Sequence, residues 1–243
     1  MLSALVPVVL GVLFASILRG FTGFGFGLAA VPLLSLALPP AEAVPLVVAL
    51  QAVVGVAGLR GAWRLCDWRA VRGLTPGLLI GIPLGLLILT EFPPNQVRLV
   101  IGLMIAGSVI VLWRGVRLPP NPSVPITLGV GTLSGVMSGL SSMGGPPIVV
   151  YLLALSHSAA RVRATSIVYF MLSALASAGP MAWRGLIDRE VLRWTAFCLP
   201  TLFAGSWLGT WAFARAKPHH HRATALIVLS ILAVLLIGRA LVT

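Results

Sequence analysis

The residues with the clearest capacity to bind a ligand lie in two glycine-rich stretches, one in each half of the chain. The first reads RGFTGFGFG over 19–27, and the second reads SGLSSMGGPP over 138–147. Glycine lets a ligand come close to the backbone. A helix that begins at such a turn points unpaired N–H groups and the positive end of its dipole at that ligand. Two such helix starts, meeting from opposite sides, would bind an anion largely through the backbone.

Two polar side chains join the glycines as candidates. Arg19 either holds an oxyanion through its planar guanidinium or extends its charge to the protein surface. Gln51, inside an apolar segment, either bonds to a neighbouring helix or lines a cavity. The competing interpretation of the glycines is close helix packing, but their occurrence twice at matched positions favours binding. The candidate substrate-binding residues are Arg19, Gly20, Thr22, Gly23, Gly25, Gly27, Gln51, Gly139, Ser141, Ser142, Gly144, Gly145 and Pro146.

Catalytic and metal chemistry find little support in the sequence. Cys66 and Cys198 have no metal-binding spacing, and the histidines at 219–221 lie in a short basic turn typical of a solvated loop. No Ser/His/Asp set, GxGD or HExxH lies in an apolar segment, and no Walker motif supports the use of ATP. We therefore expect no enzyme activity, no metal and no cofactor.

The composition points to a membrane protein. Hydrophobic residues make up 58% of the chain and charged residues 9%, whereas a soluble domain usually has about 25% charged residues. The long unbroken apolar runs exclude a transmembrane barrel, whose strands alternate in polarity. The net charge of +12 fits the basic cytoplasmic loops of membrane proteins better than nucleic-acid binding, which we do not expect.

Ten apolar segments are predicted as helices. Two of them, 25–38 and 146–156, are short. At 1.5 Å per residue they reach only about 16–21 Å, less than the roughly 30 Å of a hydrocarbon core, so they resemble half-helices. The ten segments are 4–19, 25–38, 42–59, 74–91, 97–114, 124–139, 146–156, 164–182, 194–214 and 222–241.

The pattern of charge and an internal similarity predict two inverted repeats. Most basic residues fall in four connections, 60–73, 114–117, 161–163 and 215–222, which we place in the cytoplasm with both termini outside. The glycine-rich stretches align at an offset of 119, and PGLLIGIPLG from Pro76 aligns with PTLFAGSWLG from Pro200 at 124. The loop 60–73 is cytoplasmic while its counterpart 184–193 is outside, so the halves are inverted. They span 1–118 and 119–243 and together form one transmembrane domain of five plus five segments.

These motifs resemble the TauE/SafE sulfite-exporter family of membrane transporters. The resemblance rests on GFTGFGFGLAAVPLL and SGLSSMGGPPIVVYLL, and on the G-x-x-x-G pairs Gly81/Gly85 and Gly205/Gly209. It implies transport of sulfite, thiosulfate, sulfonates or related small organic anions, with a central site at Gly20–Gly27 and Gly139–Pro146. The chain departs from the family in the second half, where SSMGGPP replaces a fuller glycine run. The family is also usually described with about eight spans.

The predicted function is secondary transport of a small sulfur-containing anion by alternating access, in the direction of export. The alternatives are a passive small-anion channel and an uptake carrier for another organic anion. The expected location is the bacterial inner membrane, which the chain crosses several times. The expected partners are the anion and the lipid bilayer. Coupling to protons or another ion, and assembly as a homodimer, are left open. No carboxylate lies deep in a segment to form a proton relay.

Overall fold

The computed structural model describes residues 2–22, 25–115, 118–119, 122–155 and 158–215. These residues form nine helices and no strand. The helices are α1 (Leu2–Thr22), α2 (Phe26–Ser35), α3 (Pro40–Ala62), α4 (Trp68–Glu91), α5 (Pro94–Arg114), α6 (Val124–Ser141), α7 (Gly145–Ala154), α8 (Ala159–Trp183) and α9 (Arg189–Arg215).

The prediction of an all-helical, multi-pass membrane protein is confirmed. Five of the described helices, α3, α4, α5, α6 and α8, are long and apolar enough to cross a membrane. The two segments predicted to be short are the two shortest helices, since α2 and α7 have 10 residues each. The tenth predicted segment, 222–241, and the histidines at 219–221 lie outside the described residues.

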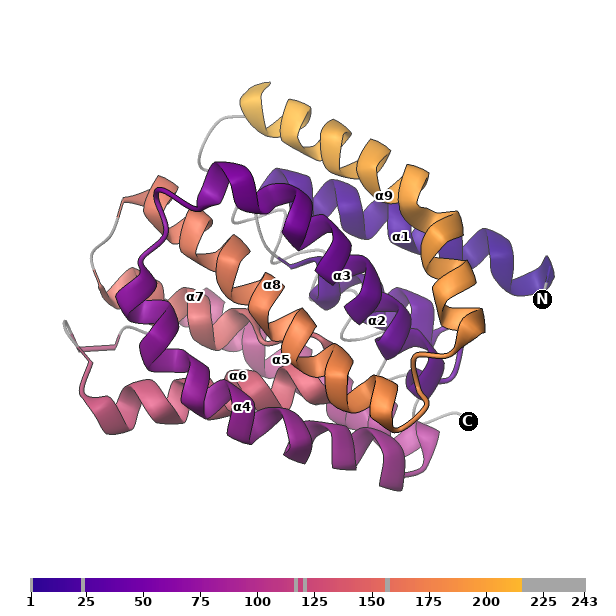
Figure 1. Ribbon diagram of the computed structural model, residues 1–243, viewed down its shortest axis with the longest axis horizontal. Helices are drawn as coiled ribbons and strands as arrows, with labels where there is room; N and C mark the ends of the chain where they lie inside the picture. Colours follow the sequence, from indigo (N-terminus) through magenta and orange to yellow (C-terminus); the bar gives the residue numbers. More distant parts are fainter. Residues whose placement is uncertain (1, 23–24, 116–117, 120–121, 156–157, 216–243) are drawn as a thin grey trace.

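The long helices form two close pairs with a third pair between them (Figure 1). Helices α1 and α9 lie at one edge, α4 and α6 at the other, and α3 and α8 lie between them. Each of these pairs joins a helix from the first half of the chain to one from the second. The two halves are therefore interlocked, and buried residues of both halves pack together in the same hydrophobic clusters.

Glycines bring the backbones of the edge pairs together. A Cβ added at Gly139 of α6 would collide with the carbonyl oxygen of Ile82 on α4, and one added at Gly20 of α1 would collide with that of Ser206 on α9. Ile82 and Ser206 are 124 residues apart, and Gly20 and Gly139 are 119 apart, the two offsets at which the halves align. Matched contacts of this kind are what a structural repeat produces. That the halves are inverted stays a prediction.

Helices α3 and α8 run antiparallel. Beyond the end of α3, the backbone N–H of Asp67 donates to Thr165 Oγ1 near the start of α8, at 2.9 Å. Asp67 also begins α4, because its carboxylate accepts from the N–H groups of Arg69 and Ala70. At the other end of the molecule, the first residue of α3, Pro40, and the residue after α8, Arg184, line the same hollow.

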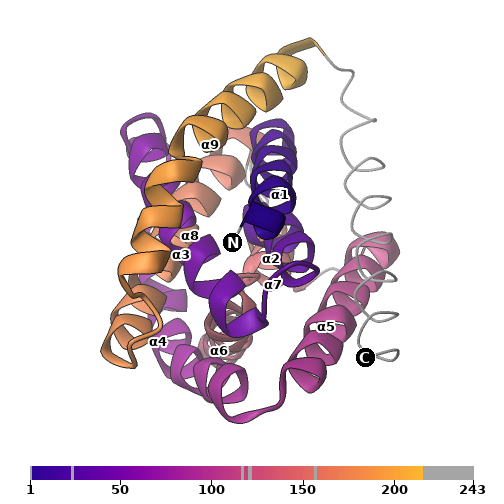
Figure 2. The same ribbon diagram turned by 90° about the vertical axis from the view of Figure 1, so that its right-hand side faces the viewer.

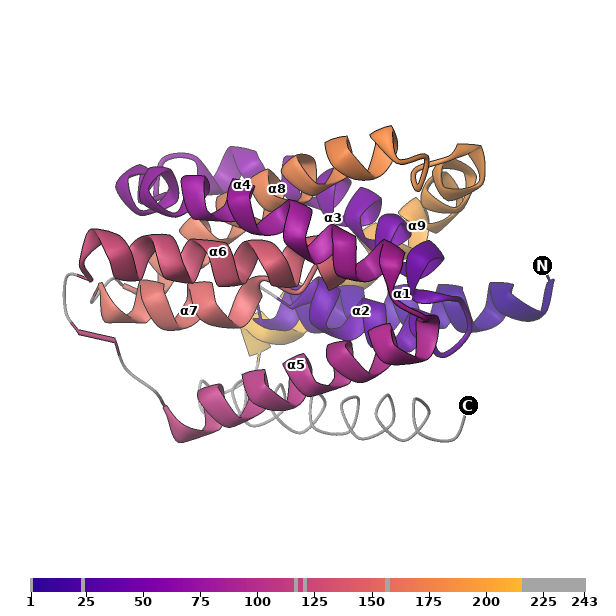
Figure 3. The same cartoon turned by 90° about the horizontal axis from the view of Figure 1, so that it is seen from below.

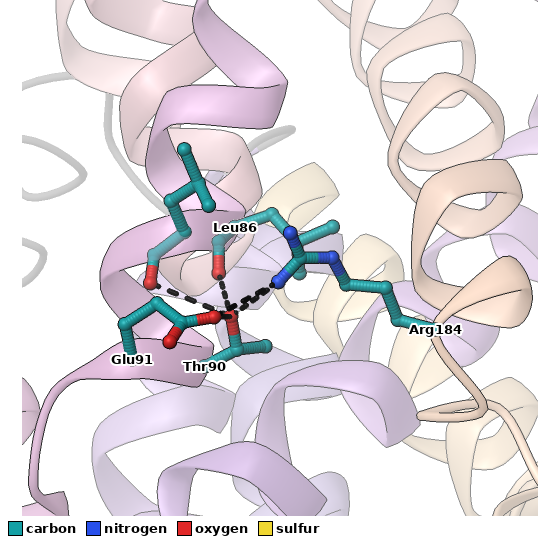
Figure 4. A network of polar contacts seen from close by, with 5 residues as sticks. Leu86, Thr90, Glu91 and Arg184 are labelled. Atoms are coloured by element: carbon teal, nitrogen blue, oxygen red, sulfur yellow. Dashed lines mark hydrogen bonds and ion pairs between the residues drawn. The ribbon is translucent and has the colours of Figure 1, made fainter.

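The end of the molecule that holds Arg184 is joined by a polar network (Figure 4). Arg184 Nη1 donates to Thr90 Oγ1 at 2.6 Å and lies 3.4 Å from Glu91 Oε1. Thr90 in turn donates to the carbonyl oxygen of Leu86 at 3.1 Å. These contacts tie the last turn of α4 to the connection between α8 and α9. The ion pair is exposed, and such pairs usually contribute about 0–1 kcal/mol.

Each short helix runs back alongside the helix that precedes it, toward the end of the molecule where that preceding helix begins. A Cβ at Gly11, halfway along α1, would meet Leu34 near the end of α2. Thr127 Oγ1 at the start of α6 lies 3.1 Å from the Tyr151 hydroxyl near the end of α7. The pairs α1–α2 and α6–α7 are therefore hairpins that reach the middle of the molecule and return.

The two short helices lie end to end across the centre of the molecule, with their N-terminal ends facing one another (Figure 3). They lie between α5 on one side and the layer of α3, α8 and α9 on the other (Figure 2). The tips of both hairpins are thus covered by protein. Irregular backbone at membrane depth is tolerated under that condition.

Candidate functional site

The tips of the hairpins α1–α2 and α6–α7 meet beside the packed pair of α3 and α8. A Cβ added at Gly27, in the first turn of α2, would collide with the carbonyl oxygen of Ser142, in the turn before α7. Beside this contact, Gln51 Nε2 of α3 donates a long hydrogen bond, 3.5 Å, to the carbonyl oxygen of Phe170 on α8. Gln51 and Phe170 are separated by the repeat offset of 119. The meeting point therefore joins equivalent elements of both halves.

A small cavity lies at this meeting point. The volume within it that the centre of a water molecule can reach is about 20 Å³, and roughly 10–15 Å³ is needed for one water. The lining residues are Arg19, Gly25, Phe26, Gly27, Leu28, Gln51, Gly55, Ser142, Met143, Gly145, Ile167, Phe170 and Met171.

The first turn of α2 lines the cavity. Gly25 precedes the helix with a φ of 90°, which a glycine adopts readily, and no side chain caps the helix start. The first N–H groups of a helix have no carbonyl partner within it, so those of Phe26, Gly27 and Leu28 can bind an anion. At the far end of α2, Arg98 Nε donates to the carbonyl oxygen of Ser35 at 3.3 Å, a favourable position for a cation.

The turn between α6 and α7 has a different construction. Ser142, the residue after α6, has a φ of 54°, and the N–H of Met143 donates to the carbonyl oxygen of Met137 at 3.2 Å. Helix α7 then begins with Gly145, Pro146 and Pro147. Because proline has no N–H, the first turn of α7 has fewer donors than that of α2. An anion cradle built from backbone N–H groups would therefore be one-sided, with α2 as the main donor.

Side-chain hydroxyl groups of α6 and α8 support the turn between α6 and α7, which is the second hairpin tip. Ser134 Oγ donates to the carbonyl oxygen of Gly144 at 2.7 Å, and the Tyr169 hydroxyl donates to Ser134 Oγ at 3.2 Å. Ser173 Oγ donates to Ser138 Oγ at 2.8 Å in the next turn of the same two helices. All four side chains are buried. They fix the shape of the turn that contacts Gly27.

Arg19 is the charged residue of the site. It lies in the last turn of α1 and lines the cavity. Its Nη2 atom donates to the carbonyl oxygen of Val54 on α3 at 3.5 Å, a long hydrogen bond. The guanidinium therefore retains donors for a bound anion. Arg19 thus lies beside the uncapped start of α2, and both direct positive charge at the same space.

The structure brings some of the candidate residues together at the cavity and places others elsewhere. Those that line the cavity are Arg19, Gly25, Gly27, Gln51, Ser142 and Gly145. Gly20 and Gly139 lie instead in the close contacts of α1 with α9 and of α6 with α4. Gly23 and the side chain of Thr22 lie outside the described residues.

The remaining candidates surround the second tip without lining the cavity. Ser141 is buried and donates its hydroxyl to the carbonyl oxygen of Met137 at 2.9 Å. Gly144 faces the serines behind the turn, since a Cβ there would collide with Ser134 Oγ and Ser138 Oγ. Pro146 is buried in the first turn of α7. Their role as binding residues stays a prediction.

The sequence analysis did not identify the apolar part of the lining. Outside the two glycine-rich stretches, the missed residues are Leu28, Gly55, Ile167, Phe170 and Met171, and inside the stretches Phe26 and Met143 were not named as binding residues. The repeat alignment contained a signal for one of them, because Phe170 occupies the position equivalent to Gln51. Gly55 allows the close approach of α8, since a Cβ there would lie 2.8 Å from Met171 Cβ.

Comparison with known proteins matches most of the chain. The model of the family "Sulfite exporter TauE/SafE" matches residues 8–236. The chain is 27% identical over 195 residues to a "Probable sulfite/organosulfonate exporter TauE" of Cupriavidus necator, with 77% of this chain and 76% of that protein covered. It is 28% identical over 176 residues to a "Probable inner membrane transporter protein TsaS" of Comamonas testosteroni, with 70% and 71% covered. No solved structure matches the chain. With a family match over nearly its whole length, the chain belongs to the TauE/SafE sulfite exporter family.

Proposed function

We propose that the protein is a secondary transporter of a small sulfur-containing anion, such as sulfite, thiosulfate or an organosulfonate, in the bacterial inner membrane. The observation that carries the proposal is the central cavity, where Arg19 and the uncapped start of α2 face the same space. A charged side chain at membrane depth is costly and usually serves the transported solute. The sulfur chemistry and the direction of export rest on the description of the family and on the name of the relative from Cupriavidus necator. The name of the second relative supports the inner membrane.

The proposed mechanism is alternating access. Helices α3 and α8 run antiparallel at the centre, and the hairpins α1–α2 and α6–α7 enter from opposite ends of the molecule. A two-fold axis between such halves would lie in the membrane plane, as in transporters with inverted repeats. If the two halves exchanged their conformations, the cavity would open first to one side of the membrane and afterwards to the other.

A passive channel and an uptake carrier for another organic anion are the alternatives. Flux into proteoliposomes separates a carrier from a channel, because carrier flux saturates with anion concentration and channel flux stays linear over the same range. Direction can be read from inside-out and right-side-out vesicles loaded with labelled sulfite. Linear flux without saturation would replace the carrier by a channel.

The role of Arg19 provides the direct test. Arg19→Ala should lower sulfite affinity at least tenfold, about 1.4 kcal/mol. Arg19→Lys should retain part of the affinity, because lysine keeps the charge but loses the planar fork. Arg60→Ala is the matched control, since Arg60 is exposed at the end of α3. Equal sulfite affinity in wild type and Arg19→Ala, with both proteins folded, would contradict a binding role for Arg19.

A further inference from the structure

A groove between α4 and α8 shares no lining residue with the central cavity. The two helices run in the same direction (Figure 1). Near their starts, Asp67 bonds to Thr165. At their ends, Arg184 bonds to Thr90. The centre of a water molecule can reach about 390 Å³ of the groove, whereas one water needs roughly 10–15 Å³. The groove therefore has room for a ligand much larger than water.

The walls of the groove are apolar, and part of them is exposed. Leu87 of α4 is 42% exposed and Trp183 of α8 is 91% exposed. In the described part of the chain, a Cβ added at Gly179 would point into open space. Both helices are long and apolar enough to cross a membrane, where such a surface faces the acyl chains of lipids. The residues that α4 and α8 contribute to these walls are Pro83, Leu86, Leu87, Gly179, Pro180 and Trp183.

Arg184 places a positive charge at one end of the groove. It is the only charged residue among the described residues of the lining. Its Nη1 atom makes both contacts, to Thr90 and to Glu91 (Figure 4). Its Nε and Nη2 atoms have no hydrogen bond to a described residue. The side chains of Arg184 and Glu91 are 38% and 65% exposed, and an exposed ion pair of this kind is weak. Arg184 can therefore bind a second acceptor without losing its contacts to α4.

We propose that the groove binds a membrane phospholipid, with one acyl chain between α4 and α8 and the phosphate on Arg184. Arginine binds phosphate oxygens through two N–H groups at once, and Nε and Nη2 form such a pair. Tryptophan is enriched at the membrane–water interface, the depth at which lipid phosphates lie, and the exposed Trp183 adjoins Arg184. The groove is apolar along its length and cationic at its end, which is the order of groups in a phospholipid.

Phosphatidylglycerol and its two parts test the proposal on the purified full-length protein in detergent. Diacylglycerol with the same acyl chains lacks the phosphate, and glycerol 3-phosphate lacks the chains. The melting temperature is measured while each compound is titrated. A ligand that binds only the folded protein stabilises it, so phosphatidylglycerol at about ten times its dissociation constant should raise the melting temperature by roughly 3–6 °C. Each part alone should raise it by less than about 1 °C at the same concentration.

The comparison of the three compounds can overturn the proposal in three ways. No shift with phosphatidylglycerol would mean that the groove is not a lipid site. An equal shift with diacylglycerol would remove the role of the phosphate. An equal shift with glycerol 3-phosphate would make Arg184 part of a site for a soluble phosphate instead of a lipid.

Two substitutions remove the two parts of the site separately. Arg184→Gln removes the cation, and Gly179→Leu fills the groove with a side chain. Each should reduce the lipid-induced shift at least about twofold, measured from the lipid-free melting temperature of the same variant. Arg189→Gln and Gly107→Leu are the matched controls and should keep the full shift. Arg189 is exposed at the start of α9 and does not line the groove, and a Cβ at Gly107 of α5 also points into open space.

Glu91→Gln separates lipid binding from the ion pair. Arg184→Gln also loses the contacts to Thr90 and Glu91, so its lipid-free stability falls for a second reason. Glu91→Gln breaks the ion pair but keeps the charge of Arg184, and it should keep the lipid-induced shift. An equal loss of the shift in Glu91→Gln and Arg184→Gln would assign the effect to the ion pair and overturn the phosphate site. An unchanged shift in folded Arg184→Gln would do the same. If Arg184→Gln fails to fold, the three compounds on the wild-type protein still decide the proposal.

Discussion

Gly145→Ala should raise the stability of the protein and lower its affinity for the anion. Gly145 is the first residue of α7 and lines the cavity. The Cβ of an alanine there would lie 3.5 Å from Phe170 Cζ and 3.8 Å from Leu28 Cδ1. Both distances are ordinary van der Waals contacts. The methyl group fits the closed structure but occupies space that an anion needs.

The two expected effects have opposite signs. Replacing glycine by alanine in a helix stabilises a protein by about 0.5–1 kcal/mol. The cavity has about 20 Å³ for the centre of a water molecule, so one methyl group removes much of it. We expect sulfite affinity to fall at least tenfold, about 1.4 kcal/mol. Thermal unfolding in detergent and sulfite binding should be measured on the same purified variant.

Gly144→Ala is the neighbouring control. A Cβ at Gly144 points away from the cavity and collides with the hydroxyl groups of Ser134 and Ser138. This variant should lose about 1–3 kcal/mol of stability through overpacking. If Gly145→Ala binds sulfite as tightly as wild type, the cavity at Gly145 is not the binding site. If it is destabilised, the space around Gly145 is smaller than the structure indicates.

Three further predictions concern the turn between α6 and α7, the orientation of the chain and the reactivity of Cys66. Ser134→Ala should cost about 1 kcal/mol of stability, measured by unfolding in detergent, because the buried Gly144 carbonyl loses its donor. Ser134→Thr keeps the hydroxyl and should restore most of that stability. Unchanged stability in Ser134→Ala would refute the stabilising role of this hydrogen bond. In intact cells, a membrane-impermeant thiol reagent should label a cysteine at Arg189 and spare one at Arg64, whereas equal labelling would reject the inverted repeat. Native Cys66 should react slowly, since it is buried and burial raises the pKa of its thiol.

The helical architecture could be predicted from the sequence because lipid restricts the choice. In hydrocarbon, backbone groups must bond within a helix or a closed barrel, so apolar runs report helices directly. The lengths of the runs also distinguished α2 and α7 from spanning helices. The glycine-rich turns could be located because glycine is costly in a lipid-facing helix unless it serves packing or a ligand.

The apolar half of the site could not be predicted for the same reason. In a soluble protein, an apolar side chain marks the interior. In a membrane helix, Ile167 facing a cavity and Leu175 on an exposed surface have the same character, because both surroundings favour apolar residues. Gly20 and Gly27 present a similar difficulty. Each has a backbone carbonyl where its Cβ would be, yet only Gly27 lines the cavity.

The pairing of each edge helix with a helix from the other half of the chain has a consequence for biosynthesis. Helix α1 packs its glycine face on α9, and α4 packs on α6. Helix α1 is therefore inserted long before the ribosome has made the helix that covers Gly20. Until then its small-residue surface is open to lipid or to other membrane proteins, and a chain that ends at residue 118 keeps α1 and α4 permanently without these neighbours. Nascent α1 should therefore depend on an insertion factor or chaperone until α9 arrives, and the two halves should reach the native state only when both are present in the same membrane.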